Sequence, residues 1–471
     1  MLQYIRSSFG LNKNVQYFHF KEKNMNTTFK AGFARVNVTP SMNTPIIGYY
    51  IERRVEGVLD ELEANAVAFE CNGKKAVIIS VDNCAIGEKR LTSVRERISE
   101  LCGVDKDCIF IASTHTHTGP GASLTYGETE EILKEYWKRL LDKCVDVACL
   151  AINDLRPAKI GCGVGEAKNV AFIRRFRMKD GSVMTNPGVN NPDILEPLET
   201  VDERVGVLRI DREGAESIVV LNFGNHPDTV GGSLISADWP GFARKFVEKA
   251  IDNTKCIFFN GAQGDVNHVN VHPKGGDFND MFNDFDGCSR GYGHARHIGR
   301  VVAAAAMQVY DKVAWCDVDD ICGKVEEIEV PSNKPTADQL PLARKYNELH
   351  EAGRDDEIPY KGMALTTVVA EAKRMVSLEN GPDSFTMPLS VLKIGKIAFV
   401  GFPGEPFTEI GRAVKAIEGF EIVLPCCCVN DSRGYFPSSK AYTEGGYESR
   451  ASRFAPGISE LLVSKAKEML K

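Results

Sequence analysis

The regular alternation of apolar, β-branched runs with amphipathic helical patterns is the strongest constraint on the fold of this chain. Seven runs have the length of a buried strand: AVAFEC, KAVIISVDN, CIFIAST, SIVVLNFG, CIFFNG, KIAFVGF and FEIVLPCCCV. Four other segments carry apolar residues three and four positions apart with charges on the opposite face: EKRLTSVRERISELCG, EEILKEYWKRLLDKCVDVACLAI, WPGFARKFVEKAID and YGHARHIGRVVAAAAMQVYDKV. This alternation predicts an α/β fold with a mixed β-sheet core flanked by helices.

One large domain is expected to account for most of the chain. Length alone allows two or three domains, but no clean linker is evident, so residues 29–471 are assigned to one α/β unit. Residues 1–28 lack clear periodicity and are left as an unassigned N-terminal tail. The stretch 316–395 opens with the alternating GKVEEIEV and continues into a charged helical pattern. We expect it to be an inserted subregion that controls the mouth of a pocket.

Charge, hydropathy and cysteine usage exclude several classes of protein. The chain has 57 Lys and Arg against 64 Asp and Glu, and no basic run is dense enough to follow a phosphate backbone, so no nucleic-acid partner is expected. No apolar stretch reaches the roughly 18 to 20 residues of a membrane span, and no signal peptide is evident. Fourteen cysteines are scattered without a CxxC pair, which indicates a reducing, cytoplasmic compartment.

Four of the expected strands end in polar clusters, and ligands of open α/β sheets sit outside the carboxyl ends of strands. In CIFIASTHTHTGPG, an extended chain would project His115 and His117 to one side and Thr116 to the other. Two imidazoles on one side favour a metal site, because neutral imidazole is the commonest metal ligand. The alternative is a pair of histidines that cap the strand through hydrogen bonds.

Two further clusters add one imidazole and one carboxylate. His226 follows the strand in IVVLNFGNHPDTVGG, is fixed by Pro227 and has Asp228 beside it; its alternative role is that of a hydrogen-bonded loop histidine. Glu405 follows the strand in IAFVGFPGEPFTEIGR and precedes an expected helix. A carboxylate there could equally favour the helix dipole.

The fourth cluster is rich in tyrosine. Tyr435, Tyr442 and Tyr447 lie in one loop-rich segment, with Glu448 beside the last, and they could simply pack over the end of the sheet with their hydroxyls hydrogen-bonded. A further strand ends in the glycine-rich NGAQGD, whose backbone N–H groups could line an anion or substrate pocket.

Two histidines, one glutamate and an open position form the ligand set of catalytic zinc sites, where the metal acidifies a bound water. A neighbouring His or Tyr could move protons or polarise a carbonyl, and an Arg could stabilise an oxyanion. The residues by themselves therefore predict hydrolytic chemistry at the carboxyl ends of the strands.

The ordered motifs resemble one known family. TPSMNTPIIGY, DELEANAVAFE, THTHTGPG, NHPDTVGG with SADWPG, NGAQGD, PGE before a helix, and a Tyr followed twelve residues later by YE occur in succession over residues 31–452. The chain resembles the catalytic N-terminal domain of the neutral (alkaline, non-lysosomal) ceramidases. That family hydrolyses the amide of ceramide to sphingosine and a fatty acid, within sphingolipid metabolism.

The resemblance implies a zinc ion and a set of four ligands, one of them an unusual tyrosine. By position the ligands are His115, His226, Glu405 and Tyr435.

The resemblance also implies the groups that act on the substrate. His117 and Tyr447 match the residues that position the amide and assist proton transfer. The family's site arginine follows an asparagine in an extended segment, and here Ile173 replaces that asparagine. Arg174 is chosen over Arg175 for this role, and the alternative for both is ordinary surface ion pairing.

Three departures from the family loosen the link to ceramide. Gln263 stands in the glycine-rich block where well-known ceramidases carry a serine, so an acyl-enzyme on serine is not supported. The immunoglobulin-like domain that follows the catalytic domain in those enzymes is not expected here, and neither is export. We therefore expect a zinc-dependent amide hydrolase whose substrate, a small-molecule or lipid amide, could be a smaller cytosolic amide.

Two alternatives keep the metal and change the function. Zinc chemistry is not specific to amides, so an esterase, lactonase or phosphoesterase fits the same residues. A non-catalytic binding protein with a structural zinc also fits, because four protein ligands close a zinc site.

Four other histidines lie near the acidic stretch DFNDMFNDFDG: His268, His272, His294 and His297. That stretch lacks the spacing of a calcium loop, so these histidines are assigned to loops and helix faces and not to a second metal.

Overall fold

The computed structural model describes residues 29–121, 130–275, 281–284, 286 and 288–471, so the tail assigned to residues 1–28 lies outside the described part. Nine of the described strands form one mixed sheet with the order β14-β12-β11-β6-β1-β3-β4-β5, to which β18 is added by pairing with β6. The β4–β5 and β12–β14 pairs are parallel, and the other pairs of this sheet are antiparallel. The bounds are β1 Lys30–Asn37, β3 Glu63–Cys71, β4 Lys74–Val81, β5 Ile109–Ser113, β6 Arg156–Glu166, β11 Arg204–Arg212, β12 Ser217–Phe223, β14 Thr254–Asn260 and β18 Ala314–Cys316.

A second, four-stranded sheet has the order β19-β20-β21-β23, with a parallel β21–β23 pair. Its strands are β19 Ile321–Pro331, β20 Ser384–Ile394, β21 Ile397–Gly401 and β23 Ile422–Cys426. Short strands complete the fold: β2 Gly57–Val58, β7 Phe172–Ile173, β8 Arg175–Met178, β9 Val183–Thr185, β10 Ile194–Pro197, β13 Leu234–Ile235, β15 Val266–Asn267, β16 Phe282–Asn283, β17 Ser289–Arg290, β22 Glu405–Pro406 and β24 Tyr435–Phe436. The chain thus has the expected mixed sheet core.

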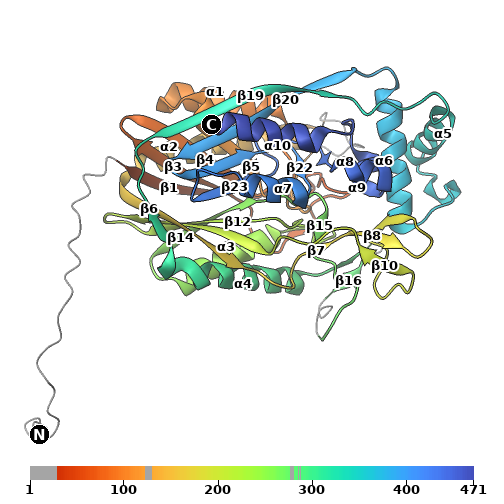
Figure 1. Cartoon of the computed structure of the whole chain (residues 1–471), viewed down its shortest axis with the longest axis horizontal. Helices are drawn as coiled ribbons and strands as arrows, with labels where there is room; N and C mark the ends of the chain where they lie inside the picture. Colours follow the sequence, from red (N-terminus) through yellow and green to blue (C-terminus); the bar gives the residue numbers. More distant parts are fainter. Residues whose placement is uncertain (1–28, 122–129, 276–280, 285, 287) are drawn as a thin grey trace, which may run out of the picture.

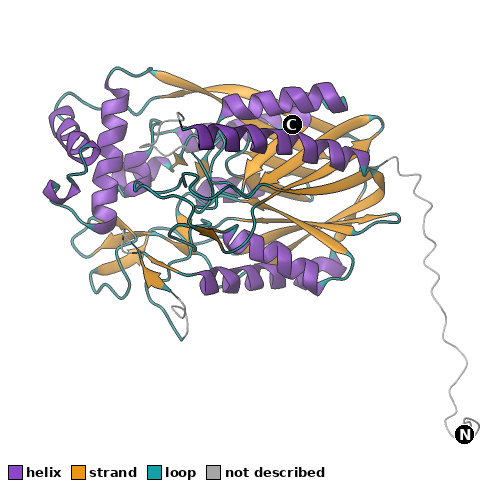
Figure 2. Cartoon of the chain, turned by 180° about the vertical axis from the view of Figure 1, so that it is seen from behind, coloured by secondary structure: helices purple, strands orange, loops and turns teal. Residues whose placement is uncertain are grey.

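Helices cover the outer faces of the strands (Figures 1 and 2). α2 packs on β1 and β3, α3 on β14, α4 on β6 and β11, and α7 and α10 on the small sheet. α5 and α6 project at one end of the molecule, at the right of Figure 1. The bounds are α1 Glu88–Cys102, α2 Glu131–Asn153, α3 Asp238–Ala250, α4 Tyr292–Val309, α5 Leu340–Glu351, α6 Gly362–Glu379, α7 Thr408–Lys415, α8 Ser439–Glu444, α9 Tyr447–Ala451 and α10 Ile458–Met469.

The segment 316–395, expected to be an inserted subregion, contributes to the core at both ends. β19 and β20 pair along their whole length in the small sheet, and the intervening α5 and α6 form the projecting part. Among the described helices, none combines the length and the apolar character that a membrane crossing requires.

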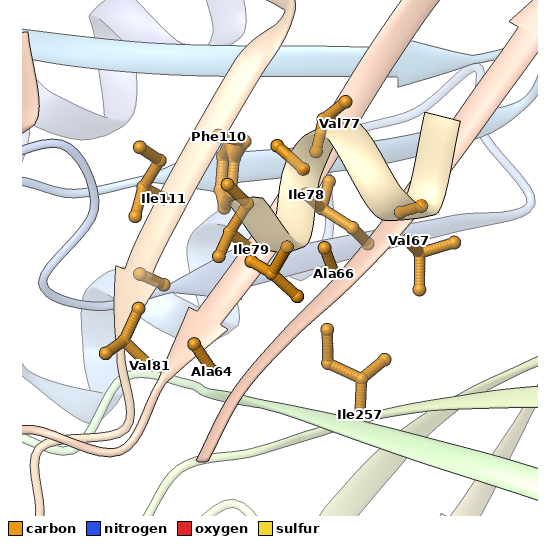
Figure 3. Close-up of a cluster of buried hydrophobic side chains, with 14 of the residues drawn as sticks. Ala64, Ala66, Val67, Val77, Ile78, Ile79, Val81, Phe110, Ile111 and Ile257 are labelled. Carbon is orange, nitrogen blue, oxygen red and sulfur yellow. The ribbon is translucent and has the colours of Figure 1, made fainter. Parts of the chain in front are cut away.

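The core brings the two ends of the large sheet together. Side chains of β3, β4 and β5 face Ile257 of β14 (Figure 3), and the ring of Phe110 on β5 lies 6.2 Å from that of Phe259 on β14. The ring of Phe399, on β21 of the small sheet, is 5.8 Å from Phe110 and 6.1 Å from Phe259. Strands that are distant in pairing order therefore end close to one another, and the loops that follow them meet.

Candidate active site

The polar motifs converge where these strands end. His115 follows β5, His226 follows β12 and Gln263 follows β14, while Glu405 lies on β22 after β21 and Tyr435 on β24 after β23. The first three belong to the large sheet and the last two follow the small one. The sequence expectation of a polar site at the carboxyl ends of strands is confirmed.

Close backbone contact between β22 and β24 fixes the carboxylate and the phenol side by side. Glu405 pairs with Tyr435 in a parallel register. A Cβ on Gly404 would lie only 2.4 Å from the carbonyl oxygen of Gly434, so glycine is required for the two chains to approach.

His115 is held in a strained backbone conformation with a defined ring orientation. Its φ of 72° lies in the left-handed region, which costs a non-glycine residue on the order of 1 to 3 kcal/mol. Its backbone N–H donates to Asn83 O at 2.9 Å, and the ring Nδ1–H donates to Cys84 O at 2.7 Å. This hydrogen bond leaves Nε2 as the nitrogen that can bind a metal.

His226 has the same arrangement on the other side. Its Nδ1–H donates to the carbonyl oxygens of Gln263 at 2.9 Å and Val266 at 3.1 Å. The side chain is completely buried, and its backbone carbonyl accepts the indole N–H of Trp239 at 3.2 Å. Nε2 is again the nitrogen that remains available.

These two histidines and Glu405 form a group able to hold a metal ion. Glu405 Oε2 lies 3.1 Å from His226 Nε2 and 3.4 Å from His115 Nε2, and the three atoms lie within 4.8 Å of one another. Among the described residues, neither His226 Nε2 nor Glu405 Oε2 has a hydrogen-bond partner, although both are buried. Burial alone would raise the pKa of Glu405, but His115 and His226 together hold that pKa well below its usual range.

A second group with metal-ligand spacing consists of Cys84, His115 and His117. It shares His115 with the first group. The His115 nitrogen beside Cys84 is already engaged by the Cys84 carbonyl oxygen, so the group built on Glu405 fits a metal better.

A small cavity adjoins the metal-ligand group and holds several of the expected site residues. Its volume is about 50 Å³. It is lined by His117, Arg174, Tyr435 and Tyr447 together with Gly48, Tyr49, Tyr50, Asn186, Asp228, Asp286, Arg290, Met363 and Thr366. Met363 and Thr366 come from α6, so the 316–395 segment forms part of the cavity wall.

His117 is wedged between the metal-ligand group and the opposite cavity wall. Its ring centroid lies 4.9 Å from that of His115 and 5.6 Å from that of His226. A Cβ on Gly48, whose φ is 120°, would lie 2.9 Å from the Cγ and Nδ1 of His117, so the ring rests directly on the glycine. Burial holds the pKa of His117 well below its usual value, which keeps the imidazole neutral.

The two candidate arginines point in different directions. The Nε of Arg174 lies 2.6 Å from Glu448 Oε1, and its NH2 group donates to Gly264 O at 2.8 Å. Its guanidinium carbon is 5.4 Å from the ring centroid of Tyr435. Arg175 donates instead to Gly445 O at 2.8 Å and is not among the cavity residues. Of the two arginines, Arg174 therefore lines the cavity and Arg175 does not.

The tyrosines of the C-terminal cluster also separate. The rings of Tyr435 and Tyr447 lie 5.5 Å apart at the cavity, and the hydroxyl of Tyr447 donates to that of Tyr50 at 3.4 Å. Burial raises the pKa of Tyr435 above its usual value, against the opposing effect of Arg174. Tyr442 donates to Phe454 O at 2.7 Å and packs in the core beside the small sheet.

Residues 29–289, more than half of the chain, match the family model described as neutral/alkaline non-lysosomal ceramidase, N-terminal. The chain belongs to this ceramidase family. The resemblance inferred from the motifs is thereby confirmed.

Relatives in this family cover different shares of the chain. Neutral ceramidase of Pseudomonas aeruginosa is 22% identical over 485 aligned positions, which cover 91% of this chain and 69% of the relative. Neutral ceramidase A of Dictyostelium discoideum is 25% identical over 266 positions, which cover 52% of this chain and 36% of the relative. The rice neutral ceramidase is 25% identical, and the match covers 47% of this chain and 29% of the relative. The matches thus span about a third of the length of the two eukaryotic ceramidases.

Solved ceramidase structures share the fold. The crystal structure of the Pseudomonas aeruginosa neutral ceramidase superposes with a TM-score of 0.69 at 18% identity, covering 94% of this chain and 74% of the other. A second structure, a ceramidase complexed with C2, gives a TM-score of 0.68 at 17% identity, covering 94% and 76%. At these identities the likeness establishes the fold alone.

Sequence reasoning missed several cavity residues of this ceramidase-family chain. For Tyr50, the only feature of the sequence that could have indicated a role is its position directly after the TPIIGY motif. For Arg290 and Asp286, the only such feature is the acidic stretch in or near which they lie, part of which is outside the described residues. The guanidinium of Arg290 donates to both oxygens of Asp228, at 3.0 and 2.9 Å. Burial alone would raise the pKa of Asp228, but Arg290 keeps that pKa well below its usual range.

Proposed function

We propose that this chain is a zinc-dependent hydrolase that cleaves an amide bond. One observation carries the proposal: two imidazole nitrogens and a carboxylate oxygen, from His115, His226 and Glu405, converge in the buried interior beside a cavity. The buried Nε2 and Oε2 atoms without hydrogen-bond partners among the described residues fit a bound cation. Membership of the ceramidase family supports the amide bond.

His115, His226 and Glu405 would hold the ion, with Tyr435 as the fourth ligand. Imidazole nitrogen and carboxylate oxygen are ligands that zinc prefers, and the backbone carbonyls that fix both rings are the outer partners usual at such sites. When bound, zinc would supply a Lewis acid that polarises a carbonyl and acidifies water.

The residues of the cavity supply the other requirements of amide hydrolysis. Arg174, oriented by Glu448, and the hydroxyl of Tyr447 would stabilise negative charge that develops on the amide oxygen. The imidazole of His117, neutral before the reaction, would accept a proton from the attacking water and pass it to the departing amine nitrogen. Gln263, in the position of the serine of well-known ceramidases, is buried and is not among the cavity residues.

The cavity beside the metal-ligand group is small and partly open to solvent, and we propose that its substrate is smaller than ceramide. Because about 10 to 15 Å³ of such volume holds one water, a cavity of about 50 Å³ has room for a few waters or a short polar group. Met363 and Thr366 of α6 form part of its wall. We therefore favour a short, polar amide over one with two long hydrocarbon chains.

A panel of amides tests this function. The purified, zinc-analysed chain would be incubated with amides graded from short N-acyl amines to long-chain ceramides, with matched esters and a chelator control, and the products would be identified by mass spectrometry. Chelator-sensitive release of amine from short amides is expected. Cleavage of esters but not of amides would show that the chain is an esterase. Bound zinc without cleavage of any compound in the panel would favour a zinc-containing binding protein.

Two histidine variants test the metal site. His226→Ala should lose both zinc and activity, because it removes a buried ligand. His297→Ala is the matched control, because it removes an exposed imidazole from α4 and should retain both. Full zinc content and full activity in His226→Ala would refute the site.

A further inference from the structure

The cavity wall on the far side of His117 is formed by carboxylates. Asp228 and Asp286 both line the cavity. The Nδ1 of His117 lies 3.6 Å from Asp228 Oδ1, and the hydroxyl of Tyr49 donates to the same oxygen. His117 therefore stands between the metal-ligand group and this carboxylate wall.

Arg290 is a positively charged residue in this wall, and its N–H groups donate to carboxylates. Its Nε and NH2 groups donate to the two oxygens of Asp228. NH1 and NH2 donate to Asp286 at 2.8 and 2.9 Å, and NH1 also lies 3.4 Å from Asp284 Oδ2. A guanidinium has five N–H donors, so these contacts leave Arg290 no donor for a bound anion.

The other cation near the wall is also engaged. Arg53 stacks on the ring of Tyr49, with its guanidinium carbon 3.9 Å from the ring centroid. Its terminal nitrogens donate to the carbonyl oxygens of Gly232, Ile47 and His117. Among the described residues of this cluster, three carboxylates, from Asp228, Asp284 and Asp286, thus face the two guanidinium groups of Arg53 and Arg290, a formal charge of minus one. The other arginine that lines the cavity, Arg174, is paired with Glu448.

His117 is an independent indication of a ligand at this wall. It is 8% exposed, it lines the cavity, and neither ring nitrogen has a hydrogen-bond partner among the described residues. A ligand in the cavity would supply the missing partner of such a buried polar side chain. The proposed role of His117, proton delivery to the departing nitrogen, sets the amine half of the substrate on its side of the cavity.

From these contacts we propose that the carboxylate wall binds the amine half of the substrate and that this half carries a second, cationic group. The inference rests on the proposed amide hydrolysis and names its substrate class: short N-acyl derivatives of diamines. Hydrolysis breaks the amide C–N bond, adds the hydroxyl of water to the acyl carbon and moves a proton to the nitrogen. An amide whose amine half carries a carboxylate would be repelled by the negative charge of the wall, and Arg290 would have no free hydrogen-bond donor for it.

Three probes with the same acetyl group and the same four-carbon chain test the class. N-acetyl-1,4-diaminobutane carries a positive charge, N-butylacetamide none and 4-acetamidobutanoate a negative charge. With the zinc-loaded full chain, kcat/KM should be highest for the cationic probe, by about tenfold over the neutral one, and lowest for the anionic probe. Equal values for the three probes would overturn the inference and leave the proposed hydrolysis intact.

A variant and its control test whether the carboxylate wall causes the preference for the cationic probe. Asp286→Asn removes a carboxylate that lines the cavity, so it should lower the ratio of kcat/KM for the cationic probe to that for the neutral probe. Glu409→Gln removes an exposed carboxylate of α7 that is not among the cavity residues, and it should preserve the ratio. A ratio that stays unchanged in Asp286→Asn would contradict the assignment of the wall.

Binding supplies a readout that does not depend on turnover. In calorimetry, 1,4-diaminobutane should bind the zinc-loaded chain about tenfold more tightly than butylamine, and Asp286→Asn should reduce that difference. If no amide in the panel is cleaved, the proposed hydrolysis fails, while the calorimetric comparison still decides the charge preference. Equal binding of the two amines would overturn it.

Discussion

Glu405 and Tyr435 are direct neighbours in the parallel β22–β24 pair, although they follow different strands of the small sheet. This pairing sets the carboxylate that lies between His115 and His226 next to the phenol that lines the cavity. This backbone contact therefore joins the metal-ligand group, through Glu405, to the cavity, through Tyr435.

Removing the charge of Glu405 should abolish metal binding. Changes to the outer partners of metal ligands usually cost 10 to 100-fold in affinity, so loss of a direct ligand in Glu405→Gln should cost at least about 100-fold. Zinc affinity measured by competition with a chelator checks this. Glu409→Gln, at an exposed position of α7, is the control and should bind zinc normally. Wild-type affinity in Glu405→Gln would exclude Glu405 as a ligand.

Glu448 should stabilise the fold as well as orient Arg174. The carboxylate is completely buried, it lies 2.6 Å from Arg174 Nε and it accepts the hydroxyl of Thr185 at 2.9 Å. Removal of one partner from a buried ion pair costs about 3 to 5 kcal/mol. Glu448→Ala should therefore lower the unfolding free energy by about that amount in denaturant titrations.

The matching surface change is Glu357→Gln, which removes the partner of Arg354 in an exposed pair. It should leave the denaturation curve unchanged, because exposed ion pairs contribute little. A Glu448→Ala variant as stable as the wild type would show that the pair contributes no net stability.

The fold and the candidate metal ligands could be predicted from the sequence because their signals are local. HTH, NHP and PGE each place a candidate ligand directly after a strand whose apolar run identifies it, and the structure contains the expected strands and helices. The contact between β5 and β14 could not be predicted from the sequence, since these strands lie at opposite ends of the pairing order. Without it, no pattern shows that the loops of His115 and Gln263 meet.

The carboxylate wall was missed for the same reason. Asp228 and Arg290 lie in separate segments, and their pairing depends on how two loops fold against one another. The choice between Arg174 and Arg175 likewise required contacts far away in sequence, since Arg174 NH2 donates to Gly264 O and Arg175 NH2 donates to Gly445 O. Adjacent residues of one type cannot be distinguished by spacing alone.

Acid should destabilise the chain through His268. Burial lowers the pKa of His268 to about 4, whereas an unfolded histidine has a pKa near 6.5. Below about pH 6.5 the unfolded state binds a proton that the folded state does not, so stability is fully present above this pH and falls toward pH 4. The slope due to His268 is up to about 1.4 kcal/mol per pH unit.

The variant His268→Gln removes this titration. Its unfolding free energy relative to the wild type should rise as the pH falls from about 6.5 to 4, even if the variant is less stable at neutral pH. His297→Gln, at an exposed position on α4, should follow the wild type across the range. A constant difference between His268→Gln and the wild type would contradict the argument.

Gly48 should be required for the position of His117 and not for metal binding. A Cβ there would lie 2.9 Å from two atoms of the imidazole ring, so Gly48→Ala should displace the ring and lower kcat by about tenfold or more while zinc content is retained. Gly73→Ala is the matched control, because Gly73 also has a positive φ of 80° but nothing lies within 4 Å of its Cβ position. Both variants carry backbone strain of about 1 to 3 kcal/mol, so a loss of turnover confined to Gly48→Ala isolates the contact with His117. An equal loss in the two variants would assign the effect to strain.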